Sequence, residues 1–209
     1  MPLFKTSTAT AICLLTACLD PQDQTPDGTL VVAQELASTW VRNFNPLLSV
    51  GSVRVAARAC MYEPLAIYNT LSGEWEGRLA ESFQWSEDSL HLEFRLREEV
   101  RWSDGTAFSS EDVRYTFELL REHPSLDTHG VWTFLSSVGT NESGHLEFSF
   151  QRSFVPGLTA IAQQAIVPKH VFSKVDDVET FMNEHPVGTG PFTEVLRWDK
   201  QVWDLGRNP

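Results

Sequence analysis

The stretch Val100–Leu120, "VRWSDGTAFSSEDVRYTFELL", gathers acids, a tryptophan and an Asp-Gly pair, and its local chemistry decides how the middle of the chain folds. The pair at 104–105 is turn chemistry, because glycine accepts a positive φ and aspartate bonds the backbone beyond it. Ser109 and Asp112 have the spacing of a capping box, although the box proper ends in Glu or Gln. The stretch therefore predicts a turn followed by a capped helix.

The predicted helix accounts for the positions of Glu111 and Asp112 without a catalytic role. Glu111 and Asp112 fall in its first turn, where carboxylates complement the helix dipole. Val113, Phe117 and Leu120 recur at helical spacing and predict its buried stripe. Asp104, in the turn, needs no other role. We therefore interpret all three acids as scaffold.

Two hairpins are expected to flank this helix. Apolar and polar residues alternate over 90–97, which predicts a strand with one buried face, and 83–97 is expected to form a hairpin. The same alternation over 146–150 predicts a second hairpin that turns at 141–144. A further turn is expected at 71–73.

The other elements follow from shorter patterns. Strands are expected at 29–35, after the Gly-Pro loop "HPVGTGPF", and in the final "QVWDLGRNP". Short helices are expected at 51–60, on both sides of Pro168, and at 176–184, and a loop at 40–48.

Composition excludes several classes of protein. The chain has 209 residues, 42% of them hydrophobic, which suffices for a core. A net charge of -12 without a basic cluster disfavours nucleic-acid binding. No dinucleotide, phosphate-loop or zinc-protease motif is present, the six histidines are scattered, and no acid pair stands out, so neither cofactor, metal nor catalytic residue is predicted.

The pattern of residues 1–17 predicts a secretory signal. Leu15-Thr16-Ala17-Cys18 resembles the lipobox of bacterial lipoproteins, which implies a lipid on Cys18 and a flexible tether over 18–27. A frayed N-terminus or a short buried helix is the alternative. Cys60 would then have no disulfide partner and is interpreted as a small buried hydrophobe. Among the seven tryptophans, Trp40 and Trp132 lie in polar loops, where an indole suits stacking on a ligand as well as core packing.

Four segments carry a family resemblance: the stretch 94–120, "QAIVPKHVF", "NEHPVGTGPF" and the terminal "LGRNP". In this order the chain resembles the family 5 extracellular solute-binding proteins, the peptide and oligosaccharide receptors of ABC importers. The resemblance implies a mixed α/β (α+β) fold, a periplasmic-binding-protein-like lobe of class II, cluster C. Residues 28–58 and 176–209 would form an incomplete ligand-facing domain with a mixed sheet, and 59–175 a smaller inserted domain, while the second lobe is expected to be missing.

The resemblance also implies the function. We expect a lipid-anchored monomer on the periplasmic or extracellular face that captures an oligosaccharide or oligopeptide by lobe closure and delivers it to a permease. By analogy with the oligosaccharide branch, Trp40, Asn45, Trp132 and Gln164 are expected to face the cleft. A secreted hydrolase acting on the same ligands, or a truncated product that does not bind, are the alternatives.

Overall fold

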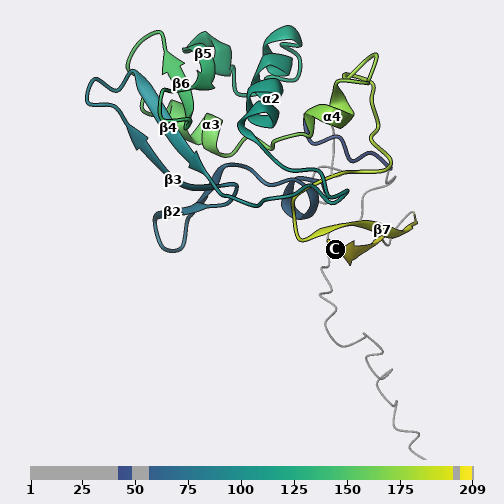
Figure 1. The fold of residues 1–209 in the computed structure, drawn as a ribbon. Coiled ribbons are helices and arrows are strands. Elements are labelled where there is room, and N and C mark those ends of the chain that lie inside the picture. Colours follow the sequence, from purple (N-terminus) through teal and green to yellow (C-terminus); the bar gives the residue numbers. More distant parts are fainter. Residues whose placement is uncertain (1–41, 49–56, 200–202, 209) are drawn as a thin grey trace, which may run out of the picture. The chain divides into compact units, whose positions relative to one another are not determined.

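The structure, a computed structural model, describes residues 42–48, 57–199 and 203–208. Within them helices and antiparallel strands are mixed (Figure 1), which confirms the α+β class. Every strand pair among these residues is antiparallel, so the mixed sheet that the resemblance implied is not seen in them. The predicted strand at 29–35 lies outside the described residues, as do the signal segment, the tether and most of the helix predicted at 51–60. The described end of that helix, Ala57–Met61, is a single π-helical turn (η1).

The centre of the fold is a four-stranded sheet in the order β3-β4-β6-β5. Its strands are β3 (Ala80–Trp85), β4 (His91–Leu96), β5 (Leu135–Thr140) and β6 (Leu146–Phe150). Both predicted hairpins are therefore confirmed, and β4 pairs with β6 in the middle. A separate hairpin, β1 (Ala66–Asn69) with β2 (Glu74–Gly77), closes around the turn expected at 71–73.

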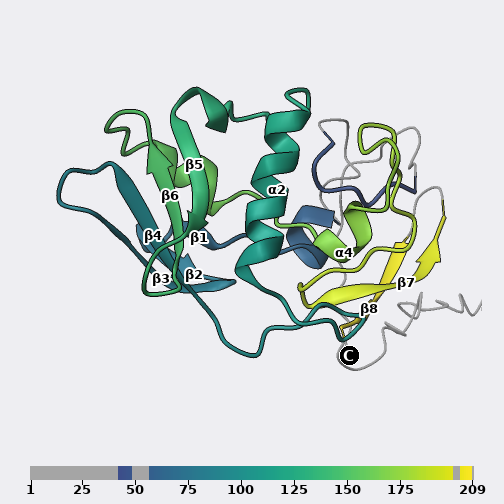
Figure 2. The same cartoon turned by 45° about the horizontal axis from the view of Figure 1, so that its top comes forward.

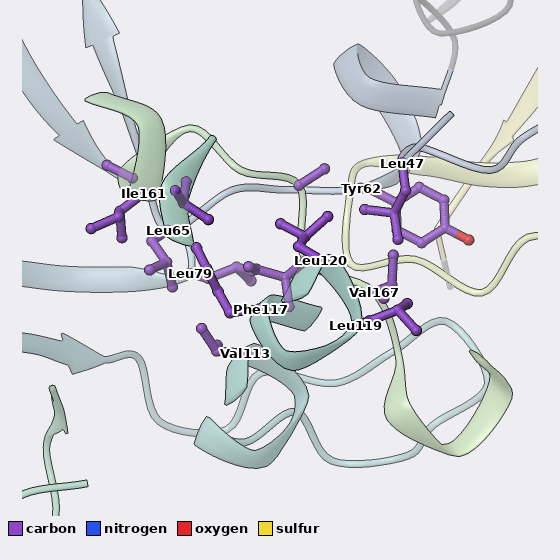
Figure 3. Packing of buried hydrophobic residues seen from close by; sticks show 14 of the residues in the cluster. Leu47, Tyr62, Leu65, Leu79, Val113, Phe117, Leu119, Leu120, Ile161 and Val167 are labelled. Atoms are coloured by element: carbon purple, nitrogen blue, oxygen red, sulfur yellow. The ribbon is translucent and has the colours of Figure 1, made fainter. Parts of the chain in front are cut away.

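Helix α2 (Ser110–Glu122) packs against this sheet (Figure 2). Its predicted stripe is buried, and Phe117 meets Phe148 of β6 at a ring distance of 4.8 Å. Figure 3 shows Val113, Phe117 and Leu120 directed among the same cluster of buried side chains. Burying a side chain of this size contributes about 1.5–3 kcal/mol, so the stripe holds the helix to the sheet.

Short helices and loops complete the body. The 3-10 turn η2 (Val131–Thr133), α3 (Gly157–Ala162) and α4 (Lys169–Phe172) follow in sequence, the last two on either side of Pro168 as predicted. The chain ends in a two-stranded ribbon of β7 (Phe192–Trp198) and β8 (Trp203–Arg207).

The helix predicted at 176–184 is wrong. The structure has turns there, because the Asp177 carboxylate accepts the backbone N–H of Glu179 and the hydroxyl of Thr180. Such local bonds offer the backbone an alternative to helix. Asn183 adds a left-handed residue at φ 49°, which a helix does not contain.

Candidate functional site

The acids of the opening stretch have structural partners. The Asp112 carboxylate is buried and accepts the N–H of Ser109 at 3.0 Å, the N–H of Lys169 at 2.9 Å and the Trp102 indole N–H at 3.4 Å. It therefore starts α2, starts α4 and holds Trp102, which is itself 2% exposed. A carboxylate with this many fixed donors is a brace between segments.

Asp104 and Glu111 lie at the surface. Burial raises the pKa of Asp104, but hydrogen bonds from Thr106 and His170 outweigh it and hold that pKa below its ordinary value. Hydrogen bonds from Arg114 and Lys169 lower the pKa of Glu111 to about 2. Both carboxylates stay ionised at neutral pH and are engaged by neighbours, so neither has the raised pKa that a general acid requires.

Asn45 joins two distant segments. Its side-chain N–H₂ donates to the carbonyls of Val178 and Phe181, both at 3.1 Å, and its oxygen accepts the N–H of Leu47. The residue is 3% exposed, so the structure gives the amide a bracing role. Its predicted contact with a ligand stays a prediction.

Gln164 and Trp132 differ in exposure. Gln164 is 6% exposed and donates to the carbonyl of Ala165. Trp132 is half-buried: its indole N–H donates to the carbonyl of Phe117 at 2.8 Å, and the Arg121 guanidinium lies 4.8 Å from its ring centre. Trp132 is thus held in a fixed orientation and stays partly exposed, while the two predicted amides are buried.

Three further residues were considered in the sequence: Trp40, Cys18 and Cys60. Trp40 and Cys18, the predicted lipidation residue, lie outside the described residues. Cys60 is partly buried, and desolvation raises the pKa of its thiol, which keeps it protonated and poorly nucleophilic.

The glycines of "VGTGPF" serve close packing between backbones. A Cβ on Gly188 would stand 2.0 Å from the Met61 carbonyl oxygen, and one on Gly190 would stand 2.3 Å from that of Cys60. The N–H of Gly190 donates to the Met61 carbonyl at 2.9 Å. The loop therefore lies directly on η1, and only glycine fits at these two positions.

Beside this loop lies a hollow that sequence reasoning missed. Its lining comes from three separate segments: Arg42, residues 184–187 and residues 193–195. No single one of these segments shows a binding motif, so only their proximity in the fold indicates the hollow.

Two negative findings apply to the described residues. Among them no group of three or more His, Cys, Asp or Glu side chains is placed to hold a metal ion. Across residues 42–48, 57–199 and 203–208, no helix has the length and apolar character needed to cross a membrane.

Comparison with protein families gives a match over most of the chain. The model for bacterial extracellular solute-binding proteins, family 5, matches residues 74–209. A putative ABC transporter peptide-binding protein of Brucella ovis is 28% identical over 172 residues, which are 80% of this chain and 32% of that protein. A probable peptide-binding protein, YejA, of Agrobacterium fabrum is 30% identical over 71% of this chain and 25% of its own length.

Solved structures agree with the sequence matches. The periplasmic oligopeptide-binding protein of Thermotoga maritima superposes with a TM-score of 0.73 at 28% identity, over 80% of this chain and 31% of that one. The mannohexaose-bound form of that protein gives the same TM-score at 27% identity, over 82% of this chain and 32% of that one. The chain therefore spans about a third of the length of these relatives.

Proposed function

The chain belongs to the bacterial extracellular solute-binding proteins of family 5, and we propose that it contributes part of the substrate receptor of an ABC importer. The observation that carries the proposal is the family match over 74–209, together with the agreement of fold. In this function the protein binds a solute and presents it to permease subunits without altering a covalent bond. The bracing roles of Asp104, Glu111 and Asp112 support a binding protein over a hydrolase.

The proposed ligand is an oligopeptide or an oligosaccharide. Relatives are described as peptide-binding proteins, and one related structure holds mannohexaose. Capture works by closure of two lobes, so that ligand shifts an equilibrium between open and closed forms.

We extend the proposal to the organisation of the chain. Residues 28–58 and 176–209 are proposed as the ligand-facing domain, with 59–175 inserted between them. The N–H of Phe44 donates to the Met182 carbonyl, and the Asn183 side chain donates to the carbonyl of Phe44. These bonds join the two outer segments, which supports placing them in one domain.

Titration calorimetry with two probes tests the function. Trialanine and mannohexaose are titrated separately into the purified chain, with a buffer titration and mannitol as controls. Saturable heat from either probe is expected, with neither probe hydrolysed afterwards, as checked by mass spectrometry. Turnover of either probe would contradict the proposal. Absence of heat from both would also contradict it, provided that the probe concentrations suffice to detect the weaker binding expected of a single lobe.

Trp132 is the predicted ligand contact that the structure leaves accessible, and W132F tests it. The variant keeps an aromatic ring and removes the N–H bonded to Phe117, so we expect stability to fall by about 1 kcal/mol. If the indole also stacks on a ligand, W132A should weaken mannohexaose binding about tenfold, which corresponds to 1.4 kcal/mol, while W85A leaves it unchanged. Equal affinities of W132A and the parent chain would remove Trp132 from the site.

A further inference from the structure

Two arginines of this acidic chain lie on aromatic rings instead of pairing with carboxylates. The Arg121 guanidinium lies 4.8 Å from the ring centre of Trp132, and that of Arg152 lies 5.2 Å from the ring centre of Phe154. Within the part of the chain that the structure describes, neither guanidinium has an ion pair or a hydrogen bond. Arg114 of the same helix, by contrast, is paired with two carboxylates.

The central sheet brings the two rings to the same end of the fold. Leu135, the first residue of β5, pairs with Phe150, the last residue of β6, so the segments just before β5 and just after β6 leave the sheet side by side. Phe134 connects them, because it follows Trp132 by two positions and its ring lies 4.9 Å from that of Phe154. We call the resulting surface the arginine patch: Arg121, Trp132, Arg152 and Phe154.

A guanidinium held by a ring keeps its hydrogen-bond donors available. The attraction of a ring for a cation is electrostatic and needs no oxygen acceptor, so the five N–H groups of the fork remain free to meet one. Such planar forks bind carboxylates through two parallel hydrogen bonds. The ring also restricts a long side chain beforehand, which lowers the entropy cost of binding. Both arginine side chains are exposed, so a partner can reach them.

The carboxylates nearest to the arginine patch are directed elsewhere. Glu118, three positions before Arg121, accepts a hydrogen bond from Arg114 at 2.6 Å. Glu122 follows Arg121 directly and therefore lies about 100° further round the helix. Asp127 accepts a backbone N–H of the patch at 3.4 Å. None of the three forms an ion pair with either patch arginine, so the surface presents two cations that the described residues do not neutralise.

We propose that the arginine patch docks a carboxylate-rich segment of a partner protein, with one carboxylate on Arg121 and another on Arg152. Val155 follows the patch in the sequence and is 54% exposed, so it adds apolar contact. An anionic membrane suits the surface less well, because its dense charge would repel a chain of net charge -12. A short segment meets only the charges within about 8 Å, the screening length at physiological salt.

The inference goes beyond the proposed function, because it concerns a protein partner and does not depend on which solute is bound. It also gives Trp132 a use that differs from stacking on a solute. In this use the indole orients Arg121 and is not itself the group that meets the carboxylate.

Nuclear magnetic resonance of the ¹⁵N-labelled chain tests the docking, with hexaglutamate as the probe and hexaserine as the uncharged control. Hexaglutamate is expected to shift the side-chain N–H signals of Arg121, Arg152 and Trp132, and to bind more weakly as salt is raised. R121Q and R152Q should each weaken this binding roughly fivefold, since each removes one two-bond contact. R207Q removes the same charge from an exposed position of β8 and is the matched control, which should bind as the parent does.

Lysine variants separate the planar fork from charge alone. R121K and R152K keep the charge and lose the fork, so each should weaken hexaglutamate binding roughly threefold. Binding by both variants as tight as that of the parent would overturn the two-bond contact.

The remaining outcomes each overturn the inference in a recognisable way. Hexaglutamate shifts confined to residues outside the patch, or an equal loss in R207Q, would overturn the patch as the docking surface. Patch shifts from phosphatidylglycerol vesicles but not from hexaglutamate would assign the surface to a membrane. No shift from hexaglutamate would overturn the docking and leave the proposed function standing, since solute binding is measured separately by calorimetry.

Discussion

Single carboxylates hold segments of this chain together over long sequence separations. Asp112 joins the start of α2 to the start of α4, fifty-seven positions further along. Glu93 of β4 likewise joins separate segments, because its carboxylate accepts hydrogen bonds from Gln84, Asn141 and His145. In both cases the acid lies in one element and its donors in others, so its role depends on the fold.

D112A should destabilise the chain by about 2–4 kcal/mol, because it removes a helix cap and leaves buried donors unpaired. E111A is the matched control, because the Glu111 carboxylate is about half exposed and pairs with Arg114 at the surface. We therefore expect this variant to lose less than about 1 kcal/mol of stability. Urea unfolding measures both. Equal losses would show that Asp112 is not a brace.

Glu93 should make stability depend on pH in the acid range. The hydrogen bond from His145, with those from Asn141 and Gln84, lowers the pKa of Glu93 below its ordinary value. A lowered folded-state pKa means that the unfolded chain binds the proton more readily, so this contribution is present above the unfolded pKa and is lost as pH falls through the folded one. E93Q should therefore flatten the fall in stability between about pH 5 and pH 3, relative to the exposed control E142Q. Parallel curves for the parent chain and E93Q would contradict this.

At the scale of elements, the contact between η1 and the loop 186–191 is set by glycine. Backbone lies directly on backbone there, and the bond from Gly190 to Met61 runs through the contact. The loop also bonds the opening stretch, since Ser103 donates its N–H to the Gly188 carbonyl. Three segments that the sequence separates widely are thereby joined through one short loop.

G188A should cost about 3 kcal/mol or more, because its Cβ would overlap the Met61 carbonyl and neither backbone can move freely. G139A in β5 is the matched control: no atom lies within 4 Å of the position its Cβ would take, so we expect a change within about 0.5 kcal/mol. Thermal unfolding followed by circular dichroism compares them. A stable G188A chain would show that the close approach is not required.

At the scale of the whole molecule, the proposed receptor function depends on where the chain is held. If Cys18 carries a lipid, as the resemblance of residues 15–18 to a lipobox implies, C18S should move the protein from the membrane fraction to the soluble fraction in bacteria that process lipoproteins, because the thiol that would be acylated is removed. C13S, five positions upstream, is the matched control and should remain in the membrane fraction. Fractionation and immunoblotting measure both. Membrane retention of C18S would argue against a lipid on Cys18.

Patterns within one segment of sequence determined the elements of this fold. Alternation over 90–97 placed a strand, the turn at 104–105 formed as predicted, and helical spacing from Val113 to Leu120 placed the stripe of α2. These features depend on neighbours a few positions away, which the sequence displays directly. The helix expected at 176–184 failed for the same local reason, since the Asp177 turn outweighed its spacing.

Only the tertiary structure decided what the polar side chains do. Nothing in the sequence indicates that the side-chain amide of Asn45 is hydrogen-bonded to residues 178 and 181. Nothing in it indicates either that Thr193 lines a hollow bordered by Arg42. The partners lie more than 130 positions away in both cases, and such proximity arises from packing of the whole body. Periodicity in sequence reports which face of an element is buried, whereas the identity of the neighbour across that face is fixed only when the elements pack.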